Sequence, residues 1–170
     1  MSTIKYSGEV KIKIKNRPPI KTKNNGTQTL FNFLYDTLGG ILVPYTDSAK
    51  YRKLLPTKIE LIKDVPITTD NYGNYSASSV LIEPILLTDR SFTVAQDTIN
   101  TESRFLLCST MLSHTKLSSS YSPDSKGKLL LINGNNKILA YVNLDLAELA
   151  AIKDDVNGQA VIEWKLMFSN

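Results

Sequence analysis

The stretch NNGTQTLFNFLYDTLGG, residues 24–40, differs from the rest of this chain because its apolar side chains recur at helical spacing. Its stripe consists of Leu30, Phe31, Leu34 and Leu38, widened by Phe33 and Tyr35. Almost every other apolar run alternates with polar residues or is rich in β-branched residues, which is typical of strands. The sequence therefore predicts one helix, about Thr27 to Leu38, packed against an otherwise β-rich domain.

Both ends of this helix are signalled by residues that commonly end helices. Asn25 or Thr27 can accept hydrogen bonds from the first-turn amides. Gly39 or Gly40 can adopt the left-handed conformation that stops a helix.

The residues before the helix predict a half-buried strand. From Glu9 to Lys15 the sequence alternates, so that three β-branched side chains face one way and Lys11, Lys13 and Lys15 face the other. Two prolines then end the strand, because proline cannot donate to a sheet ladder. The next four residues, Ile20–Lys23, are expected to pair back as a second short strand.

The residues after the helix predict further antiparallel strands. These are Lys58–Lys63, Ser79–Glu83, Ser91–Ala95, Arg104–Leu112, the hairpin of Lys128–Ile132 and Lys137–Val142, and a closing strand over Ala160–Phe168. The run Arg104–Leu112 is more apolar than alternating, which favours a central strand buried on both faces with Cys108 in the core. Leu144–Ile152 fits either a short helix or an extended connection. We expect one antiparallel β-sandwich domain spanning residues 1–170.

The closing strand is expected to fix the C-terminal end in the core. Its inward row is Ala160, Ile162, Trp164, Leu166 and Phe168, and it includes the only tryptophan of the chain. Loss of this strand should therefore unfold the protein.

Composition narrows the functional classes. A single cysteine excludes an intramolecular disulfide framework, and no Cys and His cluster has the spacing of a metal site. The N-terminal residues lack the apolar core of a signal peptide, and no run approaches the ~20 apolar residues that would cross a bilayer. We expect a soluble protein with no cofactor and no membrane insertion.

The net charge of +4 is unevenly distributed. Met1–Lys63 carries twelve Lys or Arg against four acids, whereas Asp64–Leu112 carries two against six and Ser113–Asn170 six against six. A basic first third and an acidic middle can steer an anionic partner or favour contact between copies of the chain.

The sequence lacks familiar catalytic motifs. Cys108 and His114 are the only residues of their types, but the first is expected in a strand and the second in a loop. Paired carboxylates would have to come from Asp64, Asp70, Glu83, Asp89, Asp97 and Glu102, at expected strand ends and in loops. These patterns predict a binding or structural role and no enzyme.

Three segments are candidate interaction surfaces: the basic face from Lys11 to Lys23, the connection from Tyr45 to Lys53, and the loop from Ser118 to Ser125. The lysine row could contact phosphates, or it could be a solvated face that discourages unwanted strand pairing. The candidate interface residues are Lys11, Lys13, Lys15, Arg17, Lys21, Lys23, Tyr51, Arg52, Lys53 and Tyr121.

Three motifs, GEVKIKI (residues 8–14), NNGTQTLFNFL (24–34) and GQAVIEWKLMF (158–168), together resemble small virion proteins of tailed bacteriophages. The resemblance implies a β-sandwich subunit of a tail, connector or baseplate ring, made in the cytoplasm of the bacterial host. Its partners would be further copies of itself and other virion proteins. It implies no catalytic residues.

Two other functions stay open. A nucleic-acid-binding β-domain would use the basic first third, although arginine and clustered aromatic residues are scarce there. A carbohydrate-binding module of a host-recognition protein would need exposed aromatic rings on one sheet face, whereas Trp164 is expected in the core.

Overall fold

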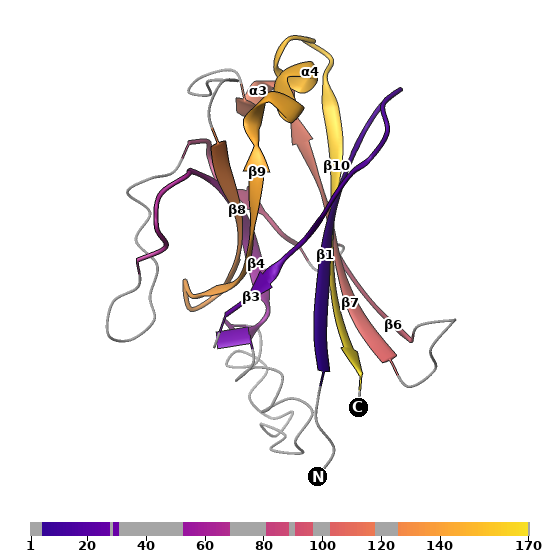
Figure 1. The fold of residues 1–170 in the computed structure, drawn as a ribbon, viewed down its shortest axis with the longest axis vertical. Helices are drawn as coiled ribbons and strands as arrows, with labels where there is room; N and C mark the ends of the chain where they lie inside the picture. Colours follow the sequence, from indigo (N-terminus) through magenta and orange to yellow (C-terminus); the bar gives the residue numbers. More distant parts are fainter. Residues whose placement is uncertain are drawn as a thin grey trace.

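Two antiparallel sheets lie face to face in the computed structural model, which describes residues 5–27, 29–30, 53–68, 81–88, 91–96, 103–117 and 126–169 (Figure 1). Apolar side chains of both sheets meet in one buried cluster between them. The predicted mainly β sandwich is therefore confirmed.

Each sheet has five strands within the described residues. Sheet A has the order β2 (Ile20–Lys23), β1 (Lys5–Ile14), β10 (Gln159–Ser169), β7 (Ser103–Ser113) and β6 (Phe92–Gln96). Sheet B has the order β3 (Asn25–Gly26), β9 (Ile138–Asp145), β8 (Lys126–Asn133), β4 (Pro56–Lys63) and β5 (Ile85–Leu86). All pairings between these neighbours are antiparallel, as the alternating sequence pattern predicts.

The closing strand β10 occupies the middle of sheet A. Trp164 lies opposite Val10 of β1 on one side and opposite Cys108 of β7 on the other. Because successive residues of a strand point to opposite faces, this register places all three side chains in the interior. The predicted inward row is confirmed from Ala160 to Leu166.

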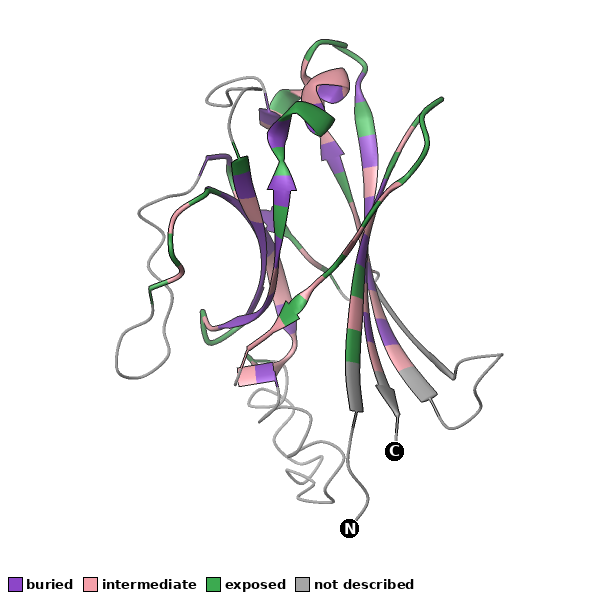
Figure 2. Ribbon diagram, in the orientation of Figure 1, coloured by how far each residue is buried: buried purple, intermediate pink, exposed green. Residues whose placement is uncertain are grey.

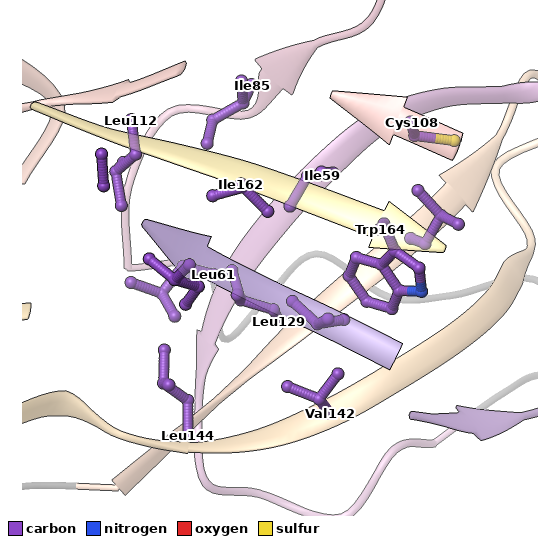
Figure 3. Close-up of a cluster of buried hydrophobic side chains, with 14 of the residues drawn as sticks. Ile59, Leu61, Ile85, Cys108, Leu112, Leu129, Val142, Leu144, Ile162 and Trp164 are labelled. Atoms are coloured by element: carbon purple, nitrogen blue, oxygen red, sulfur yellow. The ribbon is translucent and has the colours of Figure 1, made fainter. Parts of the chain in front are cut away.

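The core lies between the two sheets, where Figure 2 shows the buried residues and Figure 3 the packing of their side chains. Sheet A contributes Trp164 and Ile162, which lie across from residues of sheet B such as Leu129 and Val142. All four are fully buried or nearly so. One continuous apolar cluster therefore holds the two sheets together.

The hairpin of β8 and β9 is closed by a buried side chain. The Asn133 Oδ1 atom accepts hydrogen bonds from the backbone N–H groups of Asn135 and Lys137, both at 3.0 Å. At Gly134 an added Cβ would lie 2.8 Å from the Cα of Lys53, so the close approach of that segment requires glycine. The predicted hairpin and its turn are confirmed.

Thr27 marks the start of the predicted helix. Its hydroxyl donates to the carbonyl oxygen of Ile138 in β9 at 2.5 Å and lies 3.4 Å from the backbone nitrogen of Leu30. Thr27 is thus placed as the capping residue, whereas Asn25 belongs to β3. Thr29 and Leu30 are helical and Leu30 is buried, but Gln28, residues 31–38 of the predicted helix and the two glycines expected to end it lie outside the described residues.

Short helices cover one end of the sandwich. They are α3 (His114–Leu117), the 3₁₀ turn η3 (Leu146–Leu149) and α4 (Ala150–Lys153). The Asp145 side chain caps η3 by accepting from the backbone N–H of Ala147. The alternative left open for Leu144–Ile152 is therefore settled in favour of helix after β9 ends.

Two strand predictions need correction. In the described part of Ser79–Glu83, residues 81–83 form no strand, and β5 begins only after Pro84, which cannot donate to a ladder. The interval Arg104–Leu112 is not buried on both faces: Leu106, Cys108 and Leu112 face the core, but Met111 is 55% exposed. That outer face is open because it belongs to the uncovered side of sheet A.

Replacing Trp164 with alanine should lower the free energy of unfolding by about 3–5 kcal/mol, because it empties the largest fully buried site of the core. Urea unfolding followed by circular dichroism measures the change. The matched control is Val161→Ala, on the outward face of the same strand, which should cost less than about 1.5 kcal/mol. Equal losses at the two positions would contradict the assigned faces.

Candidate interaction surface

The outer face of sheet A gathers the predicted lysines. In the register of the three strands, Lys11 of β1 lies between Lys21 of β2 and Glu163 of β10. The neighbouring row places Glu9 between Lys23 and Lys165. Chain segments about 150 residues apart in the sequence therefore supply one charged surface.

This surface is positive overall. Its outward residues on β1, β2 and β10 are Lys11, Lys13, Lys21, Lys23, Lys165, Glu9 and Glu163, with a net charge of +3. Lys13 pairs with Glu163, their charged atoms 2.5 Å apart, but both side chains are solvent-accessible and such pairs contribute little stability. The turn after β1 adds Lys15 and Arg17, both exposed.

Beside the charged rows runs an apolar strip on the outward sides of β10 and β7. Its members are Phe105, Leu107, Met111, Val161 and Met167, all half-buried or exposed. Register places Met167 opposite Phe105 and Val161 opposite Met111. The Lys165 ammonium lies 4.3 Å from the centre of the Phe105 ring, which joins the apolar strip to the charged rows. In Figure 1 no described helix or strand lies against this side of sheet A.

The outer face of sheet B is different because part of it is apolar and covered. Val65 and Ile67, in the chain that follows β4, pack on a second buried cluster formed by Ile62, Leu130, Ile132 and Ile138. Glu60 on this face is only 1% exposed, with one carboxylate oxygen 2.7 Å from the Lys58 ammonium. The rest of this face is charged, because Asp64, Lys126 and Asp145 are exposed there.

A groove of about 1080 Å³ lies where β1 and β7 end and β10 begins, and we call it the end groove. Its basic wall is formed by Lys13, Lys15 and Arg17 from β1 and the turn after it. Its acidic wall is formed by Asp154 and Asp155, from the connection between α4 and β10. Figure 1 shows both segments at the same end of the sandwich.

The end groove also exposes apolar side chains. Met111 is 55% exposed and Val156 is 78% exposed, and both line it. They are two of the three large hydrophobic side chains that are exposed among the described residues, the third being Leu86. Exposed apolar groups beside charge are typical of binding surfaces.

Two carboxylates away from the end groove have pKa values that neighbouring charges shift. The pKa of Glu148 is raised, first by partial burial and then by the negative charge of Asp145. The pKa of Asp64 is lowered by its hydrogen bond and ion pair with Lys128. Two carboxylates therefore lie close together beside η3, whereas Asp64 is paired with Lys128.

The structure separates the two residues that a nucleophilic site would need. Cys108 is buried in the core, and burial raises the pKa of its thiol to about 12. His114 begins α3 and lines the end groove, and its Nδ1 atom is buried without a hydrogen-bond partner in the described chain. A protonated thiol inside the core is not a nucleophile for a substrate in that groove.

The ten predicted interface residues fall into three groups. Lys11, Lys13, Lys15, Arg17, Lys21 and Lys23 come together on sheet A and its β1–β2 turn. Lys53 lies elsewhere, beside the β8–β9 turn of sheet B. Tyr51, Arg52 and Tyr121 lie outside the described residues, as do Asp70, Asp89, Asp97 and Glu102 of the carboxylate set.

Sequence analysis did not identify the acidic wall or the exposed apolar residues of the end groove. Asp154 and Asp155 are visible in the sequence as adjacent acids, but nothing local shows that they line the same groove as Lys15. Met111 falls in a run that reads as wholly buried. Their proximity depends on the pairing of β1, β7 and β10, which joins distant segments.

The fold and this surface define an antiparallel β-sandwich with one charged outer face and a groove at one end. Comparisons with protein families, curated proteins and solved structures gave no match. Among the described residues no three His, Cys, Asp or Glu side chains are grouped to hold a metal ion. The helices described here include none with the length and apolar character to cross a membrane.

The Cys108 thiol should react with a disulfide reagent at pH 8 only when the protein unfolds. A pKa of about 12 against the ordinary 9.0 lowers the thiolate fraction about a thousandfold, and burial blocks access as well. The labelling rate should therefore rise in urea along the unfolding transition. In the control Cys108→Ala with Ser109→Cys, the thiol moves to the outward face and should label at once in buffer. Rapid labelling of the wild type in buffer would contradict the buried position.

Proposed function

We propose that this chain is a non-enzymatic structural subunit of a bacteriophage virion, which assembles through protein–protein interfaces into the tail, connector or baseplate region. One observation carries the proposal: the outer face of sheet A combines an apolar strip with charged rows. Stable protein interfaces commonly place apolar and aromatic side chains beside a polar, solvated rim. The motifs that resemble virion proteins of tailed phages point the same way.

The arrangement of charge favours directional assembly. Basic side chains are concentrated on the outer face of sheet A and the β1–β2 turn, whereas Asp145, Glu148, Asp154 and Asp155 lie around the helices at one end. Complementary patches of this kind speed encounter and fix orientation, and they make association sensitive to salt.

Nucleic-acid binding is the second candidate because the lysines of sheet A are regularly spaced. Lysines two residues apart on one strand are separated by about 6.8 Å. Lys11, Lys13 and the neighbouring Lys21 could follow a phosphate backbone at such intervals. Glu9 and Glu163 interrupt the row, however, and Lys165 occupies one face of Phe105, the aromatic side chain on this surface. A carbohydrate platform built on Trp164 is disfavoured because that residue is fully buried.

Light scattering coupled to size exclusion tests the proposal on the purified chain, at low and high salt and with and without a DNA oligomer. We expect a discrete oligomer without DNA, weakened by salt because charged surfaces take part. A chain that stays monomeric, or that gains mass only with DNA and with a steep salt dependence, would overturn the structural assignment.

A further inference from the structure

We infer that the end groove is the contact through which two copies of this chain associate, with the basic wall of one copy against the acidic wall of the other. The inference deepens the proposed function and rests on it, since it presumes self-association. It assigns that association to a particular surface, formed by the β1–β2 turn and the α4–β10 connection.

The first argument is charge complementarity. Lys15 and Arg17 are exposed on one wall, and Asp154 and Asp155 are exposed on the other. No ion pair within 4.0 Å joins the two walls in the described structure, where Lys13 pairs instead with Glu163. Two positive and two negative side chains therefore remain available to a partner.

The second argument is symmetry. In a contact with two-fold symmetry both copies use the same surface. If a first residue of one copy touches a second residue of the other, the second residue of the first copy touches the first residue of the other. A groove with one basic and one acidic wall satisfies this condition when the two-fold axis runs along the groove, because that rotation places each wall against its opposite. A single surface can therefore be complementary to itself.

The third argument is the exposed apolar surface. Met111 and Val156 lie in the same groove, and a second copy would cover them. Protein interfaces are enriched in methionine, and charged side chains lie mostly at their rims. The apolar residues would thus supply burial and the charged walls orientation.

The fourth argument is local order. The acidic wall is held by the Asp155 side chain, which accepts from the backbone N–H of Asn157 at 2.9 Å, and by the hydrogen bond from Gly158 N–H to the Asp155 carbonyl at 2.7 Å. The basic wall follows a tight turn in which Arg17 N–H donates to the Ile14 carbonyl at 3.2 Å. Walls that are already ordered lose less conformational entropy on association.

An alternative occupant fits only half of the groove. A nucleic acid or an acidic peptide would be attracted by Lys15 and Arg17 but repelled by Asp154 and Asp155. A basic peptide would meet the opposite conflict. A second copy satisfies both walls at once, which is why we assign it as the partner.

Charge reversal of each wall tests the assignment by sedimentation equilibrium. The basic-wall variant is Lys15→Glu with Arg17→Glu. The acidic-wall variant is Asp154→Lys with Asp155→Asn, which keeps the side-chain oxygen that accepts from Asn157. Each variant alone should raise the dissociation constant of the dimer at least about tenfold, because like charges would face each other.

Mixing the two variants in equal amounts should restore the dimer, since both wall contacts then join opposite charges. A chain carrying both reversals should likewise dimerise with itself. The matched control is Lys63→Glu with Lys126→Glu, which makes the same charge change on exposed residues of sheet B, outside the end groove and away from the outer face of sheet A, and should leave the dimer intact. Thermal unfolding of each variant verifies that it is folded.

The outcomes separate this inference from the proposed function. Wild-type self-association that survives both wall variants would overturn the end groove as the contact and leave the structural role standing. Loss of association in each variant without rescue in the mixture would also overturn it. A wild type that stays monomeric at all concentrations would overturn both.

Discussion

The position of β10 between β1 and β7 is the constraint on which the rest of the structure depends. Its register sets Trp164 against Val10 and Cys108 in the core, and the same register sets Glu163 and Lys165 against the lysines of β1 on the outside. Because strand side chains alternate, both faces are fixed together, and a slip of one residue would exchange them. Burial of Trp164 is thus what holds the charged outer face in its present arrangement.

The two sheets use their outer faces differently, and this difference decides where function can lie. Sheet B covers the apolar part of its outside with Val65 and Ile67, so its second apolar cluster contributes to stability. Sheet A carries an apolar strip that no described element covers, flanked by lysines that keep it in water. Contiguous exposed apolar patches that are rimmed by polar residues commonly mark sites of protein interaction. The self-association that we propose would cover that surface.

Much of the fold could be predicted from the sequence because strand patterns are local. The alternation around Val10 and around Trp164 predicted the faces of β1 and β10, and the turn beginning at Asn133 predicted the hairpin. The prediction that the strand containing Met111 is buried on both faces was wrong, because an apolar run does not reveal whether both faces of its sheet are covered. Val65 and Ile67, which follow Lys63, pack on sheet B, and two apolar residues among polar ones do not indicate this packing.

Only the basic part of the candidate site could be predicted from the sequence. The lysines of β1 and β2 are close in sequence, so their clustering follows from strand alternation and a short turn. The acidic wall lies about 140 residues later, and only the long-range pairing of β10 with β1 brings Asp154 toward Lys15. Composition shows that the first third of the chain is basic and that the last third has equal numbers of basic and acidic residues. It does not show that acidic residues of the last third lie near the basic residues of the first. The end groove is formed by the pairing of strands that are distant in the sequence, so sequence patterns alone could show its charges but not that these charges line one groove.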